Sequence, residues 1–141
     1  MHDWTRSHPR IYDIVTGFFP EARPKASWAE NPRPMLVTGV FRGRTSGEIR
    51  LRVAYGTSQV EKIRWPNLNV GNLSNLNDMN LARPTAFVIH PASQMELLRW
   101  SDQHFACWSG FSTPIIGRLP PEMQDHVAKV MLSNAAEVPQ P

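Results

Sequence analysis

The stretch from Glu48 to Tyr55 constrains the fold more than any other, because apolar residues occupy every second position along it. One set of positions holds Ile49, Leu51, Val53 and Tyr55, and the other holds Glu48, Arg50, Arg52 and Ala54. A period of two is typical of a β-strand with one buried face. We therefore expect a strand here, with Arg50 and Arg52 pointing away from the core that the apolar set enters.

A second apolar stretch, Met35 to Phe41, precedes this strand, and the connection from Arg42 to Gly47 is rich in glycine and small polar residues. This order predicts an antiparallel hairpin. In such a hairpin, Arg33 before the first strand lies near Thr57 at the end of the second, at one rim of the sheet. An arginine beside hydroxyl and amide groups is suited to hold a phosphate or a carboxylate.

The rest of the chain predicts short elements and many turns, consistent with 13 prolines and 8 glycines. Further strands are expected at 11–15, 61–65, 83–90 and 105–108, whereas 16–32 and the asparagine-rich 66–80 are expected to be loops. The apolar run 95–100 suits a strand or a helical turn, and we favour a strand. A helix is expected from Pro121 to about Asn134, because proline suits the first helical turn and an apolar stripe follows. Several short strands and one terminal helix predict a mainly β fold, a small open barrel.

The length of 141 residues suits a single domain. We expect a flexible arm over 1–10, the barrel and helix over 11–134, and a disordered tail over 135–141. No apolar run is long enough to cross a membrane, and Cys107, the only cysteine, has no internal disulfide partner. These features favour a cytoplasmic protein. The apolar neighbours Phe105 and Trp108 predict that the thiol is buried and inert.

The net charge is +3, and 12 of the 15 basic residues are arginines. Most of the basic side chains precede residue 66, which suits a first half that faces a polyanion, although solvated loops would give the same pattern. None of the five histidines has metal-ligand spacing with cysteine or carboxylate partners, so we expect neither a metal nor another cofactor.

Several short motifs occur in a recognisable order. They are Asp13-Ile14-Val15, then Arg33-Pro34-Met35-Leu36-Val37, then Thr57-Ser58-Gln59, then Leu81 to Thr85, and finally Ile116 to Leu119 before the helix. In this order and spacing the chain resembles the MazF/PemK family of toxin–antitoxin endoribonucleases over roughly residues 11–134.

The resemblance implies an SH3-like β-barrel with a C-terminal helix, usually a homodimer, similar to MazF, PemK and CcdB. It implies cleavage of single-stranded RNA without a metal, and neutralisation by a small antitoxin protein. The family's active-site arginine and threonine match Arg33 and Thr57, with Ser58 and Gln59 as neighbours. The family often has an acidic residue shortly before this arginine, and Glu30 is the nearest acid here.

The chemistry is intelligible from the residues themselves. Cleavage by the RNA's own 2′-hydroxyl needs a group that takes its proton and a donor that stabilises the charge on the pentacovalent phosphate. Arg33 can act either as that charge-assisted donor or as an acid to the leaving oxygen, and the Thr57 hydroxyl can fix a phosphate oxygen. Trp28 and Trp65 are candidate platforms for base stacking, although a tryptophan in a long loop such as Trp28 more often packs on the barrel as a lid. Arg50 and Arg52 are further candidate RNA contacts.

A second class of function is open at this point. The chain could be a non-catalytic SH3-like barrel that binds a protein or a nucleic acid. In that case Arg33 would be paired with an acidic side chain in an internal salt bridge, or the long loop from Pro20 to Trp28 would cover the rim. Thr57 would then cap a turn, which is common at strand ends.

Overall fold

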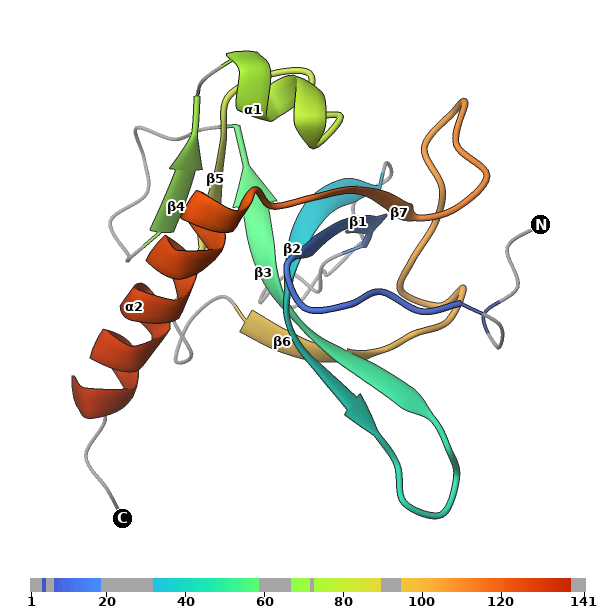
Figure 1. Cartoon of the computed structure of the whole chain (residues 1–141). Coiled ribbons are helices and arrows are strands. Elements are labelled where there is room, and N and C mark those ends of the chain that lie inside the picture. Colours follow the sequence, from blue (N-terminus) through green and yellow to red (C-terminus); the bar gives the residue numbers. More distant parts are fainter. Residues whose placement is uncertain are drawn as a thin grey trace, which may run out of the picture.

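The computed structural model describes residues 4, 7–18, 32–58, 67–71, 73–89 and 95–137. Within these residues the chain is mainly β. Seven antiparallel strands form one sheet that curls into a half-barrel, and a C-terminal helix lies along one side (Figure 1). The predicted class, a small open β-barrel with a terminal helix, is confirmed.

The strands are β1 (Asp13–Gly17), β2 (Arg33–Arg42), β3 (Ile49–Thr57), β4 (Asn67–Val70), β5 (Thr85–Val88), β6 (Met95–Arg99) and β7 (Ile115–Arg118). The helices are α1 (Leu73–Asp78) and α2 (Pro121–Glu137). Helix α2 begins at the predicted proline and extends three residues beyond the predicted end. Strand β6 confirms the strand expected at 95–100.

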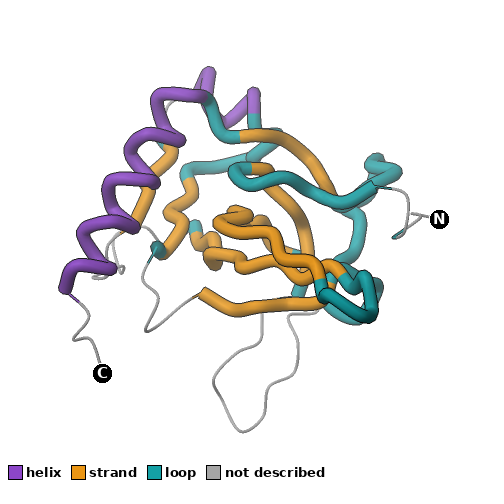
Figure 2. Tube along the Cα trace, turned by 60° about the horizontal axis from the view of Figure 1, so that its bottom comes forward, coloured by secondary structure: helices purple, strands orange, loops and turns teal. Residues whose placement is uncertain are grey.

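Strand β3 is the hub of the sheet. One of its edges pairs with β2 in the predicted hairpin. Its other edge is shared, because β6 pairs with residues 50–54 and β5 pairs with Gly56 and Thr57. The two partners diverge from β3 and start the curl of the sheet, which is visible along the strands in Figure 2.

This arrangement gives the sheet two cores, one on each face. Leu51 and Val53 face a core with Val15, Met35, Val37, Leu98, Trp100 and Phe105. Ala54, the next residue along the strand, faces the other core, which includes Leu36, Leu68, Phe87 and Val127. Both faces of β3 are therefore buried near its middle, while only one face is buried at its start. The polar positions predicted from the sequence, Arg50 and Arg52, lie on the face opposite Leu51 and Val53, as expected.

The prediction of a loop over 66–80 is wrong. This segment contains strand β4 and helix α1, and Leu68, Val70, Leu76 and Met79 are buried between the asparagines. The asparagines that the structure describes lie at exposed or half-buried positions between them. Alternating burial in β4 and a buried turn after α1 supply enough apolar contact to override the turn preference of asparagine.

Four further predictions need correction or fall outside the described residues. The first strand begins at Asp13 rather than Ile11, because Tyr12 adopts a φ of 77° and interrupts the extended backbone. The segment 105–108 is not a strand and makes only an isolated bridge from Phe105 to Gly17. Cys107 is exposed, not buried, because this irregular segment turns Phe105 inward instead. The strand expected at 61–65 lies outside the described residues.

Helix α1 and the turn after it close on β7 at a point that only glycine fits. A Cβ on Gly117 would lie 2.7 Å from the Cα of Met79, and the Asn80 side chain donates a hydrogen bond to the Ile116 carbonyl at 2.5 Å. The backbone of Gly117 contacts the backbone of Met79 directly, so neither side of the contact can move easily to make room for a side chain.

We expect Gly117→Ala to lower the free energy of unfolding by about 1–3 kcal/mol, because α1 must shift away from β7. Gly71→Ala is the matched control, since the nearest atom to its added Cβ is 3.9 Å away. Urea unfolding of both variants checks this. Equal midpoints for the two variants would show that α1 is not held tightly against β7.

Candidate functional site

Arg33 and Thr57 lie at the same rim of the sheet. The hairpin pairs Met35 with Tyr55 and Leu36 with Ala54, and continuing this register by two residues sets Arg33 opposite Thr57. On its other side Arg33 pairs with Gly17 of β1. The backbone positions that the sequence predicted to meet are therefore neighbours across the strands.

A cavity of about 220 Å³ opens at this rim. Its described lining residues are Arg33, Pro34, Gly56, Ser58, Leu81, Ala82, Arg83, Thr85 and Trp108. They include two arginines, two hydroxyls and one indole ring, and no aspartate or glutamate. Such a lining favours an anion over a cation.

Arg33 is exposed and forms no ion pair with an acidic side chain of the described residues. This distinguishes it from Arg118, which contacts Asp13 at 2.9 Å, and from Arg50 and Arg99, which both contact Glu48. Within the described part of the chain, Arg33 takes part in no internal salt bridge. None of the described acidic side chains therefore competes with a ligand for its guanidinium.

Arg83 is a second cationic residue at this cavity, and it was not among the residues predicted for the site. It lies between α1 and β5, where the Leu81 backbone N–H donates to the Leu76 carbonyl at 2.8 Å and Thr85 donates through its hydroxyl to the Arg83 carbonyl at 2.9 Å. These two bonds fix the backbone on both sides of Arg83. The signal in the sequence was the Leu81 to Thr85 motif itself, which contains it.

Trp108 supplies the aromatic wall of the cavity and was also missed. Its indole N–H donates to the Pro32 carbonyl at 2.7 Å, directly before Arg33 in the chain. Its ring lies edge-on to Phe111, with 6.4 Å between ring centroids. The hydrogen bond holds the indole beside the start of β2, so that its position is coupled to that of Arg33.

Ser58, rather than Thr57, borders the cavity. Thr57 is only 7% exposed, whereas Ser58 is exposed, because successive side chains of a strand point to opposite faces. Gly56 allows the two hairpin strands to approach closely here, since a Cβ on it would lie 2.6 Å from the Pro34 carbonyl oxygen. Glu30, Gln59, Trp28 and Trp65, the other residues predicted for this site, lie outside the described residues.

Arg50 and Arg52 are not brought to the rim. They lie toward the other end of the hairpin, and the two are held differently. Arg52 is half-buried, and it donates from Nε to the Thr38 hydroxyl and from an Nη to the Thr38 carbonyl, both at 3.1 Å. Arg50 is exposed and donates from Nε to Glu48 at 3.1 Å. Arg52 therefore stabilises the β2 bulge beside Gly39, while Arg50 faces solvent.

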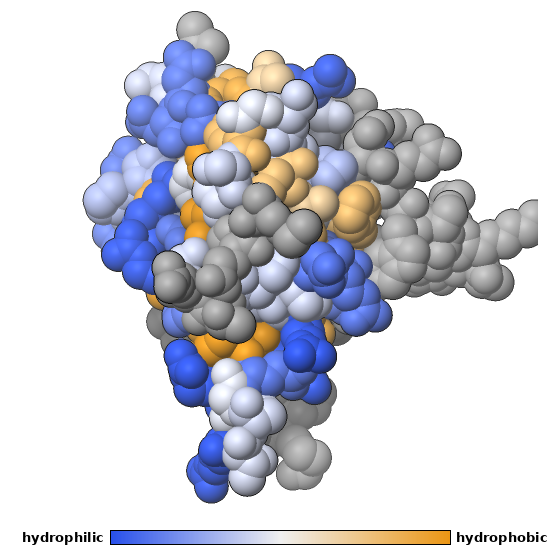
Figure 3. Space-filling view, turned by 90° about the vertical axis from the view of Figure 1, so that its right-hand side faces the viewer, coloured by the Kyte–Doolittle hydropathy of each residue, from blue (hydrophilic) through white to orange (hydrophobic). Residues whose placement is uncertain are grey.

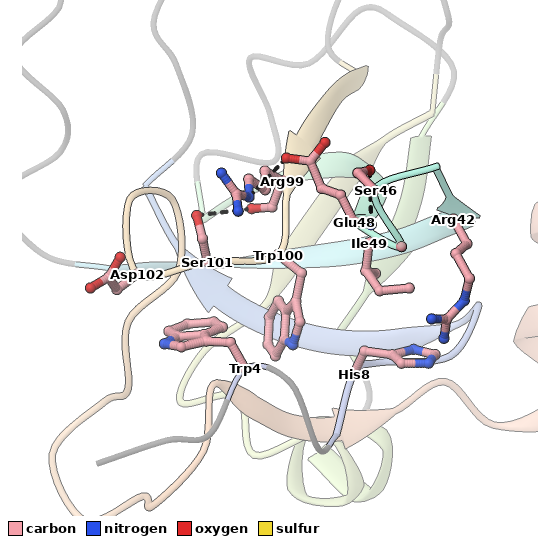
Figure 4. A pocket seen from close by; sticks show the side chains of 11 residues that line it. Trp4, His8, Arg42, Ser46, Glu48, Ile49, Arg99, Trp100, Ser101 and Asp102 are labelled. Carbon is pink, nitrogen blue, oxygen red and sulfur yellow. Dashed lines mark hydrogen bonds and ion pairs between the residues drawn. The ribbon is translucent and has the colours of Figure 1, made fainter. Parts of the chain in front are cut away.

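A larger cavity of about 680 Å³ lies at that other end, between the hairpin turn and the residues that follow β6 (Figure 4). Its lining mixes charges, because Arg42 and Arg99 face it together with Glu48 and Asp102. Glu48 is already engaged by Arg99 at 2.8 Å. Of these two cavities, the rim cavity is thus the one whose described lining carries charge of a single sign.

The comparisons with known proteins assign no family to the chain. No protein-family model matches it, and no curated protein matches its sequence.

Among the described residues, no group of three His, Cys, Asp or Glu side chains could hold a metal ion. None of the described helices is long and apolar enough to span a membrane.

His104 lies beside the end of β1, where its backbone carbonyl accepts a hydrogen bond from the Phe18 N–H at 2.7 Å. Burial lowers the pKa of this histidine below its usual value near 6.5, because a partly desolvated imidazolium is disfavoured. The unfolded chain therefore takes up a proton at this residue at a higher pH than the folded chain does.

We expect this difference to reduce stability in acid. The contribution of neutral His104 is fully present above the unfolded pKa and is lost as the pH falls through the lower, folded pKa. Between pH 7.5 and pH 5, the free energy of unfolding should fall more steeply for the natural chain than for His104→Gln. Urea unfolding at both pH values checks this, and parallel losses in the two proteins would contradict it.

Proposed function

We propose that this chain is an endoribonuclease of the MazF/PemK type, which cleaves single-stranded RNA at the rim cavity without a metal. One observation supports this above others: Arg33 and Arg83, from separate segments of the chain, line one cavity together with Ser58 and Trp108. The resemblance of the sequence motifs supplies the reaction, and the cavity supplies a place where a phosphate could be held.

In this proposal Arg33 stabilises the charge that develops when the 2′-hydroxyl attacks the adjacent phosphorus. Charge-assisted hydrogen bonds from a guanidinium are among the strongest that a protein offers to phosphate oxygens. Arg83 adds a second positive charge from a separate segment of the cavity wall. The attack forms the new P–O2′ bond and breaks the P–O5′ bond, so that the 2′-proton must leave and the 5′-oxygen must gain one.

Ser58 takes the phosphate-binding role that the sequence had assigned to Thr57, because its exposed hydroxyl borders the cavity. Thr57 is buried on the opposite face of β3 and is not among the described residues that line the cavity. Trp108 offers an aromatic ring for an unstacked base, as single-stranded RNA sites commonly do. Glu30 is the proposed general base, on the ground that it is the nearest acid before Arg33 in the sequence.

The same proposal includes a cytoplasmic location, a homodimer and a small antitoxin that covers the site. These follow from the family resemblance. The cationic rim supports the antitoxin alone, because an acidic segment of such a protein would find two arginines there.

A non-catalytic nucleic-acid-binding barrel is the second candidate function. The observation that favours it is that no carboxylate or imidazole is among the described residues that line the cavity. Such a site would hold RNA phosphates through Arg33 and Arg83 but leave the 2′-hydroxyl without a base. The two candidates differ in whether RNA is cut, while both need Arg33.

We expect Arg33→Ala to reduce the rate of RNA cleavage by at least about 100-fold, because it removes a donor to the transition-state charge. Arg33→Lys should restore part of this rate, since it keeps the charge and loses the bidentate geometry. Lys129→Ala, an exposed substitution on α2, is the charge-matched control and should cleave at the natural rate.

Cleavage of a fluorescent single-stranded RNA, followed by gel electrophoresis, checks this. If the natural chain binds the RNA without cutting it, and Arg33→Ala weakens that binding, the second candidate holds. If Arg33→Ala alters neither cleavage nor binding, the rim is not the functional site.

A further inference from the structure

One face of the sheet, beyond the part that α2 and β5 border, carries two regular rows of residues, in which Phe41, Arg50, Leu97 and Arg99 are exposed. The register sets Phe41 of β2 opposite Arg50 of β3, and Arg50 opposite Arg99 of β6. The next row runs from Gly39 through Arg52 to Leu97. Residues directly opposite each other in antiparallel strands share a face. We call this surface the β2–β3–β6 platform, made of Phe41, Arg50, Arg52, Leu97 and Arg99.

The platform holds two of the three large apolar side chains that are exposed in the described part of the chain. Phe41 is 49% exposed and Leu97 is 51% exposed. On the same face further along β3, Ala54 is fully buried in the core that contains Phe87 and Val127. The face is therefore covered at one end and open at the other.

Phe41 is held in place by the sheet beneath it. A Cβ on Gly39 would lie 2.9 Å from Cε2 of the Phe41 ring, and 3.6 Å from Cβ of Arg52. The ring therefore covers Gly39, and half of its surface remains open to solvent. An aromatic ring fixed in this way loses little conformational entropy when it binds a ligand.

The charge of this region is positive. Arg50 and Arg99 share a single carboxylate, that of Glu48, at 3.1 Å and 2.8 Å, and both contacts use the Nε atom. One negative charge thus serves two guanidiniums whose side chains are 53% and 61% exposed. Arg42 and Arg44 add two more exposed cations at the hairpin. In Figure 3 the lower end of the molecule projects downward and is largely hydrophilic, and an apolar area of the surface lies directly above it.

We propose that the β2–β3–β6 platform is a binding surface for single-stranded nucleic acid, separate from the rim cavity. An unpaired base stacks on Phe41 and contacts Leu97, while neighbouring phosphates bind the guanidiniums of Arg50 and Arg99. Sheet surfaces that combine an exposed aromatic ring with arginines recognise single strands in this manner, because only unstacked bases offer a free face.

The platform and the rim lie at opposite ends of the hairpin. Phe41 follows Arg33 by eight positions along β2, a distance of about 26 Å at roughly 3.3 Å per residue. The platform contains no residue to which we assign a catalytic role. Its binding of a single strand therefore does not depend on whether the chain cuts RNA, and the two proposals can fail separately.

The test measures binding of a fluorescent single-stranded DNA, which has no 2′-hydroxyl to attack, by anisotropy on the full chain. Phe41→Ala should weaken binding roughly tenfold through loss of stacking. Ile11→Ala is the matched control, since Ile11 is 42% exposed and lies off the platform. Phe41→Leu keeps an apolar side chain without a ring, and it should weaken binding too even if the alanine variant folds poorly.

The charges give an independent readout. A plot of log binding constant against log salt concentration has a negative slope, and each neutralised phosphate of a single strand contributes about 0.7 to its magnitude. Replacing both Arg50 and Arg99 by alanine should therefore reduce the magnitude of this slope by about 1.4. Lys129→Ala should leave this slope unchanged. Glu48→Gln removes the competing carboxylate and should tighten binding several-fold at low salt.

Three results would overturn the proposal. The first is equal affinity in Phe41→Ala and Ile11→Ala. The second is equal competition by poly-glutamate and by unlabelled DNA, which would show a surface for acidic chains in general. The third is a change in sedimentation of Phe41→Ala with unchanged DNA affinity, which would show a contact between two copies of this chain.

Discussion

The structure depends on the way β3 shares one edge between two strands. Because β6 occupies the first part of that edge and β5 the second, the sheet must curl between them. The strand then buries Leu51 and Val53 on one face and Ala54 on the other. Two cores result from a single strand, and each end of the hairpin is left with a different exposed surface.

Those two surfaces carry the chemistry that we propose. At the rim, the hairpin sets the end of β3 beside the start of β2, and the pairing with β5 brings in the segment before β5, so that Arg33 and Arg83 line the same cavity. Both side chains are exposed, and holding them there costs little desolvation energy compared with buried charges. At the other end of the hairpin, no described element covers this face of the sheet, and Phe41 and Leu97 are exposed to solvent.

Three features together were sufficient to predict the hairpin and the meeting of Arg33 with Thr57 at one rim: the alternation from Glu48 to Tyr55, the apolar stretch before it and the turn-rich connection between them. The burial of Thr57 agrees with the same alternation, since that residue continues the apolar set of Val53 and Tyr55. Arg83 and Trp108 were not predictable, because their approach to Arg33 depends on contacts between segments distant in the sequence. The β4 and α1 elements were missed because asparagine content outweighed a weaker alternation of buried side chains.

The central claim, that the rim cavity holds a phosphate of single-stranded RNA, is tested most directly by NMR titration. The Trp108 indole N–H is a suitable probe, because its bond to the Pro32 carbonyl places it beside Arg33. Its signal can be assigned by its loss in Trp108→Phe. With a non-cleavable 2′-O-methyl RNA and the Phe41→Ala chain, we predict that this signal and the Nε–H signals of Arg33 and Arg83 shift and saturate together. Rim signals that stay unchanged while the RNA is bound elsewhere on the chain would contradict the account.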